Sequence, residues 1–158
     1  MKNIKTESGF TLIELMITIV IMGVLASIAI PLMQPLLANN AAEQAAGLLD
    51  LDLKFSRNHA ITHGQTVQIT PVNDDYTLGW TIQATPANET IRTRSSLNED
   101  VTISVNGFNS GSVGFTPTGQ IEEAGDFTIT TEGCRGTKDR FISLLLSGQI
   151  AVVERNCQ

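Results

Sequence analysis

The chain has 158 residues, 42% of them hydrophobic, and a formal net charge of −6. This length fits one compact domain with an appendage, and the acidity makes the chain as a whole a poor candidate for wrapping nucleic acid. Two cysteines, Cys134 and Cys157, lie near the C-terminus; if that part of the chain leaves the cytosol, a disulfide explains them better than a metal site does.

The first predicted element is a long apolar helix that is able to cross a membrane. Leu15 to Met33 is a run of 19 residues without a charge, and at 1.5 Å per residue it can span a bilayer core of about 30 Å. Lys2 and Lys5 precede the run, which predicts a cytoplasmic N-terminus and a translocated C-terminus. A secretory signal is the alternative, cleaved after residues 27–29, but the run is too long and continues past that point.

Glu14 lies at the start of this apolar run. A charge at the centre of a membrane helix costs about 2.5–3.5 kcal/mol on insertion scales. From the residues alone, a carboxylate that reaches the headgroup level from the helix end is a sufficient explanation.

The stretch GFTLIELMITIVIMGVLASIAIP, residues 9–31, resembles the N-terminus of type IV pilins and type II secretion pseudopilins. The resemblance implies that a prepilin peptidase removes a basic leader, residues 1–9, by cleaving between Gly9 and Phe10, and that Phe10 is then N-methylated. It also implies that Glu14, now the fifth residue of the mature chain, pairs with the Phe10 amine of a neighbouring subunit during filament assembly. Such a counter-charge makes a carboxylate in hydrocarbon tolerable.

The helix is expected to continue to residue 63. Its transmembrane and assembly half would occupy residues 10–35, with a kink at Pro31 because proline removes a backbone donor and clashes with the preceding turn. Its amphipathic half would occupy residues 36–63 and end near Gly64. There the predicted apolar stripe runs through Ala41, Ala45, Leu48, Leu51 and Phe55, and the charged residues fall off it: Glu43, Asp50, Asp52, Lys54 and Arg57.

Residues 64–158 show short alternating apolar runs between turn signals, which predicts a β-rich domain with Trp80 and Phe115 in its core. The Ser147-Gly148 pair is expected to form a hairpin between the last two strands. Eight strands are predicted: Thr66–Thr70, Gly79–Ala84, Thr90–Arg94, Val101–Val105, Val113–Thr116, Phe127–Thr131, Phe141–Leu146 and Ile150–Glu154.

The segments FSRNHAITHGQTVQI, LGWTI, IRTRSSL, VGFTPTGQI and FISLLLSGQIAV follow an order similar to that of the FimT/GspH minor pilin family. This resemblance implies an α+β fold in which one long N-terminal helix packs on a C-terminal antiparallel β-domain of two small sheets. Several pilins and minor pilins close their C-terminal region with a disulfide, which implies a Cys134–Cys157 bridge here. Such a bridge contributes about 3–4 kcal/mol in the chain-entropy model.

The sequence holds no pattern that predicts an enzyme or a cofactor. His59 and His63 are four residues apart near the predicted helix end, but no nearby Cys, Asp or Glu supplies an obvious third metal ligand, so we interpret them as a solvated or capping pair. A nucleophile elbow, a phosphate loop and a dinucleotide fingerprint are all missing. We therefore expect a protein that is not an enzyme and that has no metal site.

DNA binding is a further hypothesis. Arg135, Lys138 and Arg140 lie on or near the expected disulfide loop and form a candidate phosphate-binding face. However, the DNA-binding members of the FimT-like family carry a Gly-Arg-x-Arg element near the last hairpin, and the corresponding stretch here, residues 148–151, reads GQIA. A solvated loop is therefore the favoured interpretation, and DNA is a disfavoured partner.

Taken together, these features predict a minor type IV pilin that primes or caps pilus assembly. Its expected partners are other major and minor pilins, the prepilin peptidase, inner-membrane lipid and the pilus assembly platform. It would begin as a single-pass protein of the bacterial inner membrane with its C-terminal domain in the periplasm, and end in the pilus fibre or tip. The alternatives are a minor pseudopilin of the type II secretion system and a DNA-binding minor pilin for natural competence.

Overall fold

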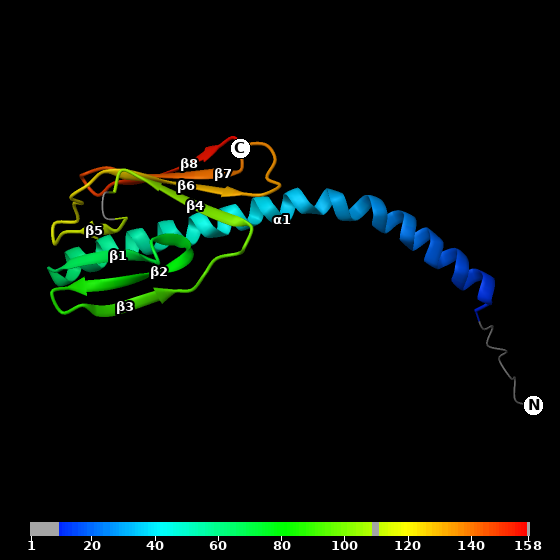
Figure 1. Cartoon of the computed structure of the whole chain (residues 1–158), viewed down its shortest axis with the longest axis horizontal. Helices are drawn as coiled ribbons and strands as arrows, with labels where there is room; N and C mark the ends of the chain where they lie inside the picture. The colour runs from blue at the N-terminus through cyan, green and yellow to red at the C-terminus, as the bar shows by residue number, and fades with distance from the viewer. Residues whose placement is uncertain (1–9, 109–110, 158) are drawn as a thin grey trace, which may run out of the picture. The chain divides into compact units, whose positions relative to one another are not determined.

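The computed structural model describes residues 10–108 and 111–157, without the side chains of residues 32, 34 and 35. This part of the chain contains one long helix, α1 (Leu12–His63, 52 residues), and eight strands (Figure 1). By its contacts the chain divides into two units between Gln34 and Pro35, and each unit is described by itself.

Two antiparallel four-stranded sheets follow the helix in the second unit, so the predicted α+β fold class is confirmed. One sheet has the strand order β3-β2-β1-β5 and the other the order β4-β6-β7-β8. The strands are β1 (Thr66–Val72), β2 (Asp75–Thr85), β3 (Glu89–Arg94), β4 (Val101–Asn106), β5 (Val113–Phe115), β6 (Gly125–Thr131), β7 (Asp139–Leu144) and β8 (Ile150–Arg155). Every predicted strand is present, although β2 begins four residues earlier than predicted.

The turns depend on residues that accept a left-handed backbone. Asn73 and Asp74 both have positive φ, 50° and 61°, which matches the twist of a tight two-residue hairpin between β1 and β2. Gly148, with φ of 76°, turns the chain between β7 and β8, and a Cβ there would collide with the carbonyl oxygen of Gly119. This second turn therefore requires glycine both for its conformation and for the close approach of another loop.

The hydrophobic core lies between α1 and the inner faces of the two sheets (Figure 1). Trp80 and Phe115 are fully buried, as the sequence predicts. Tyr76 and Phe127 meet edge to face with ring centroids 5.0 Å apart, and this contact joins β2 of one sheet to β6 of the other. The core thus holds both sheets and the C-terminal half of α1 in one packed body.

The helix face that packs on the sheets differs in part from the predicted stripe. Leu51, which the prediction placed on the buried side, is 55% exposed, whereas Leu49, Leu53 and the charged Asp52 are completely buried. The prediction is confirmed at Ala45, which is buried, and at Ala41, Leu48 and Phe55, which pack against the core. It was wrong at Leu51 and at Asp52, because it assigned every charged residue to water. The buried residues recur every three or four positions: Ala38, Ala42, Ala45, Ala46, Leu49, Asp52, Leu53, Ser56 and Ala60.

Candidate functional site

The first turn of α1 contains a reciprocal cap between Thr11 and Glu14. The Glu14 carboxylate oxygen Oε2 accepts hydrogen bonds from the Thr11 backbone N–H and from the Thr11 hydroxyl, both at 2.9 Å. In return, the Glu14 backbone N–H lies 3.3 Å from the Thr11 hydroxyl oxygen. This is the arrangement of a capping box, and it satisfies backbone donors that have no partner within the helix. The sequence analysis missed Thr11, although the spacing T-x-x-E before an apolar run is its signal.

Phe10 precedes this cap and is 87% exposed. It lies four positions before Glu14, just ahead of the helix. The pairing of Glu14 with the Phe10 amine of a neighbouring subunit stays a prediction. Gly9, the other residue of the predicted cleavage site, lies outside the described residues. Pro31 lies inside α1, whose assignment is continuous from Leu12 to His63, and the kink at Pro31 stays a prediction.

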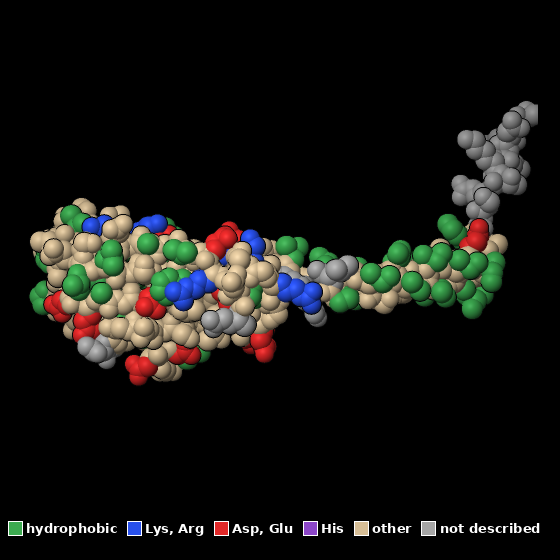
Figure 2. All heavy atoms as spheres, turned by 90° about the horizontal axis from the view of Figure 1, so that it is seen from above, with side chains coloured by type: hydrophobic (Ala, Val, Ile, Leu, Met, Phe, Trp, Pro, Cys, Tyr) green, Lys and Arg blue, Asp and Glu red, His purple; other side chains and the backbone are tan. Residues whose placement is uncertain are grey.

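The remainder of α1 before Gln34 exposes a continuous apolar surface. Its described large hydrophobic side chains are all more than half exposed, and hydrophobic atoms cover this part of the helix in Figure 2. Thr18 and Ser27 donate their hydroxyls to helix carbonyl oxygens three residues back, at 2.8 and 2.7 Å, so these polar groups need no water. By length and composition this helix is able to cross a membrane.

Asp52 is the second charged position of α1 that matters, and it lies inside the second unit. Its side chain is 0% exposed and accepts hydrogen bonds from three residues of the sheet β3-β2-β1-β5. Trp80 Nε1 donates at 2.9 Å, Arg92 donates at 2.7 Å, and Arg94 donates through two nitrogens at 3.0 Å each. Both carboxylate oxygens are therefore fully used, which makes burial of this charge tolerable.

The arrangement fastens α1 to the edge strand β3. Arg92 and Arg94 are two residues apart on that strand, so their side chains share one face, and Trp80 is the register partner of Arg94 on β2. The guanidinium of Arg92 also lies over the Phe55 ring of α1, 4.0 Å from its centroid. Sequence reasoning missed this cluster; the only signal was an aspartate between Leu49 and Leu53, together with two arginines at strand spacing.

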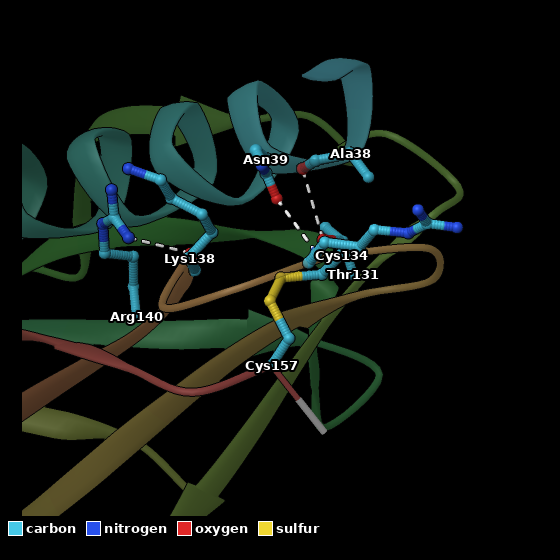
Figure 3. The surroundings of a disulfide bond; sticks show 8 residues. Ala38, Asn39, Thr131, Cys134, Lys138, Arg140 and Cys157 are labelled. Atoms are coloured by element: carbon cyan, nitrogen blue, oxygen red, sulfur yellow. Dashed lines mark hydrogen bonds between the residues drawn. A yellow bond between two sulfur atoms is a disulfide. The ribbon is translucent and has the colours of Figure 1, made fainter. Parts of the chain in front are cut away.

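The disulfide between Cys134 and Cys157 is present, with Cα atoms 5.7 Å apart. Figure 3 shows the loop around it lying against the helix turn that carries Ala38 and Asn39. Thr131 donates its hydroxyl to the Ala38 carbonyl oxygen at 3.2 Å, and the Arg135 backbone N–H reaches the Asn39 side chain at 3.4 Å. The bridge therefore connects the end of β8 to a loop that is itself fastened to α1.

The three basic residues of the DNA hypothesis have different surroundings. Arg135 is exposed and Lys138 is partly exposed, but Arg140 is only 7% exposed. The Arg140 guanidinium donates to the Lys138 carbonyl oxygen at 2.8 Å and pairs with Glu154 at 3.4 Å and with Glu43 at 3.6 Å. Arg140 lies on β7, and its ion pairs connect this strand to β8 and to α1. Its charge is therefore not presented to a ligand in solution.

Comparison with known families gives two matches. Residues 45–149 match the family of the type II transport protein GspH, and residues 4–30 match the prokaryotic N-terminal methylation motif. Two fimbrial proteins of Pseudomonas aeruginosa are each 39% identical over 77 residues, which is 48% of this chain and 49% of the relative. The chain thus matches about half the length of these curated relatives.

Solved structures show the same fold at low sequence identity. The type IV minor pilin FimU of Pseudomonas aeruginosa matches with a TM-score of 0.62 at 20% identity, over 75% of this chain and 92% of that protein. The minor pseudopilin EpsH from the type II secretion system of Vibrio cholerae matches with a TM-score of 0.59 at 11% identity, over 75% and 99%.

Proposed function

This chain belongs to the GspH family, and we propose that it is a minor type IV pilin whose role in the pilus is structural: it primes or caps filament assembly. One observation carries the proposal. The same chain joins an N-terminal methylation motif, and a helix with an uncovered apolar surface, to a β-domain of the GspH family. A subunit of this kind is held by packing of its apolar helix, in the membrane first and in a filament later.

The proposal includes a path through the membrane. The basic residues Lys2 and Lys5 keep the N-terminus cytoplasmic, so the domain from Pro35 onward crosses the inner membrane and folds in an oxidising compartment. The Cys134–Cys157 disulfide fits that compartment. Insertion, cleavage and assembly along this route require three partners: membrane lipid, the prepilin peptidase and the assembly platform.

Glu14 has the chemistry that the assembly step needs. Its oxygen Oε2 takes both hydrogen bonds from Thr11, and among the described residues no hydrogen bond to Oε1 is recorded. The carboxylate can therefore accept the N-terminal amine of a neighbouring Phe10 without giving up the helix cap. The exposed apolar helix surface supplies the packing area, and the ion pair sets the register between two helices.

A minor pseudopilin of the type II secretion system is the second candidate, because the EpsH structure resembles this fold about as closely as FimU does. The two fimbrial relatives are the observation that favours the pilus. A test is to shear surface filaments from the native host and to look for this protein by immunoblotting and by mass spectrometry.

The same mass spectrum tests the processing. We expect a mature chain that begins at N-methylated Phe10 and is present in sheared pili. A Gly9→Val variant, which changes the residue before the cleavage point, should keep its leader and remain with the membrane. A mature terminus at Ile30 would identify a secretory signal and refute the pilin proposal, whereas correct processing without any protein in surface pili would favour the pseudopilin.

A further inference from the structure

Arg135 and Lys138, the basic residues of the sequence that neither the core nor the proposed function uses, lie in the loop between β6 and β7. In Figure 1 this loop is at the end of the second unit where α1 enters it. Two hydrogen bonds hold it there: Thr131 donates its hydroxyl to the Ala38 carbonyl oxygen at 3.2 Å, and the Arg135 backbone N–H donates to the Asn39 side chain at 3.4 Å. The basic loop is therefore tied to the first turns of α1 in this unit.

The end of the chain holds the same loop from its other side. Cys134, directly before Arg135, is bridged to Cys157, and the Cys157 backbone N–H donates to the carbonyl oxygen of Gly136 at 2.9 Å. Figure 3 shows the bridge beneath the helix turn that carries Asn39. The backbone of Arg135 is thus fixed between the helix and the disulfide, while its side chain is exposed.

The exposed apolar residues of α1 end directly before this loop. Leu36 and Leu37 are 56% and 63% exposed, and Ala38, the next residue, is buried in the second unit. At 1.5 Å per residue, α1 covers about 35 Å from Glu14 to Leu37, slightly more than the bilayer core of about 30 Å. When α1 crosses a membrane with Glu14 at one surface, Leu37 reaches the other surface. The loop that carries Arg135 then lies at the level of the lipid headgroups.

The charges at this end of the domain are divided between its two sides. Within the described part of the chain, neither Arg135 nor Lys138 has a recorded ion pair. The acidic residues near the loop lie toward β4, because the Glu132 backbone N–H donates to the Asp100 carbonyl oxygen at 3.2 Å. The two basic residues follow in the part of the loop that leads to β7, and β6 separates β4 from β7 in the sheet. The side toward β7 therefore carries positive charge that is open to an anion.

We propose that Arg135 binds the phosphate of an anionic phospholipid in the bilayer that α1 crosses, and that Lys138 adds to the attraction. The inference rests on the proposed function, because it needs α1 in a membrane. A guanidinium donates paired hydrogen bonds to phosphate oxygens, and each basic side chain near an anionic surface favours the bound orientation about fivefold. Because the helix already holds the domain at the membrane, a weak contact is sufficient to orient it. The contact holds the domain against the headgroups until the subunit leaves for the filament.

The experiment uses the full chain in lipid nanodiscs with a constant fraction of phosphatidylcholine brominated on its acyl chains, the rest being phosphatidylcholine or phosphatidylglycerol. Thr137→Trp places a fluorophore in the exposed loop, and the parent chain, whose single tryptophan is the buried Trp80, gives the background. Bromine quenches only at short range, so Thr137→Trp should be quenched and Thr62→Trp, at the opposite end of the domain, should not. Phosphatidylglycerol should increase the quenching at the loop. Salt at about 1 M, which shortens the Debye length to about 3 Å, should reverse that increase.

Charge variants in the Thr137→Trp background test the residues. Arg135→Gln should lose most of the increase that phosphatidylglycerol causes, and Lys138→Gln should lose a smaller part of it. Lys54→Gln is the matched control: it removes the same charge about 25 Å beyond Leu37 along α1 and should change nothing. Inorganic phosphate and duplex DNA at millimolar phosphate should leave the quenching unchanged, because neither is held at the surface as the lipid is.

The possible failures of this test are distinguishable. A chain that does not co-elute with the nanodiscs would refute the membrane path of the proposed function, and this inference with it. A chain that co-elutes but is quenched no more in Thr137→Trp than in Thr62→Trp would overturn the inference alone. The same holds if Arg135→Gln responds to phosphatidylglycerol as its parent does, or if free phosphate or DNA removes the response.

Discussion

The two units of the chain differ in the exposure of their large apolar side chains. In α1 before Gln34 the described large hydrophobic side chains are more than half exposed, whereas in the second unit Leu49, Trp80 and Phe127 are completely buried. Side-chain hydrogen bonds differ in the same sense: those of the first unit join residues three positions apart, while Asp52 and Arg92 are 40 positions apart. The second unit therefore supplies its own tertiary environment, and the first does not. Under the proposed function, lipid and then other pilins would cover the first unit.

The largest effect is expected from removing the charge of Glu14 in the first unit. Glu14→Ala and Glu14→Gln should both be inserted and cleaved but should nearly disappear from sheared filaments, because the N-terminal amine of a neighbour loses its counter-charge. The measurement is the amount of each variant in the pilus fraction relative to the membrane fraction.

Thr11→Ala separates this role of Glu14 from helix capping. It removes the hydroxyl of the cap, at a cost of about 1 kcal/mol at the helix end, but it keeps the carboxylate charge, so we expect substantial incorporation into filaments. Normal incorporation of both Glu14 variants would refute the assembly role of Glu14. The alternative, a carboxylate that reaches the headgroup level of the membrane, would then be the explanation of this residue.

The next largest effect is expected from Asp52 in the self-contained unit. Asp52→Ala leaves two partly buried arginines and the Trp80 N–H without their acceptor, and should lower the free energy of unfolding by about 3–5 kcal/mol. Urea denaturation of a fragment of residues 35–158, followed by tryptophan fluorescence, measures this change.

Asp50→Ala is the matched control, two residues away on the same helix. Within the described part of the chain, the Asp50 side chain has one recorded ion pair, an i,i+4 pair with Lys54, whose side chain is 55% exposed. Its loss should therefore cost less than about 1 kcal/mol. Equal effects of the two substitutions would mean that the Asp52 cluster does not fasten the helix to β3.

The third largest effect is expected from removing the disulfide. A Cys134→Ser/Cys157→Ser double variant of the same fragment should lose about 3 kcal/mol of stability, because the unfolded chain regains the freedom of the closed loop. The unreduced parent fragment should contain no free thiol by titration, and its reduction should reproduce the shift of the double variant. Two free thiols in the folded parent fragment would contradict both the bridge and an oxidising compartment.

The smallest effect is expected for DNA. The fragment should bind duplex DNA weakly or not at all at physiological ionic strength, and Arg135→Ala with Lys138→Ala should change nothing measurable by fluorescence anisotropy. Arg140→Ala should instead reduce stability, because it leaves Glu154 and the Lys138 carbonyl without their donor. Micromolar binding with a slope near −0.9 per phosphate neutralised, lost with Arg135 and Lys138, would overturn this expectation.

Most elements of the fold could be predicted from local sequence. The apolar run before Gln34 identifies its helix by length, because an uncharged and mostly apolar segment long enough to span a bilayer has few alternatives. Alternating apolar residues and turn signals such as Asn73-Asp74 locate the strands, since a strand buries every second side chain. The Glu14 assembly hypothesis came from a motif of neighbouring residues, and so did the Gly9–Phe10 cleavage site.

Only the tertiary structure decided which face of α1 is buried and which charged residues are internal. Asp52 could be recognised as buried only when Trp80, Arg92 and Arg94 were known to meet it, and those partners come from strands that lie 28 to 42 positions away. The same is true of Arg140, whose partners Glu43 and Glu154 come from the helix and from β8. A charge is stable inside a protein only when its counter-charges and hydrogen-bond donors lie around it in space. A local sequence pattern does not show which distant residues will come together there.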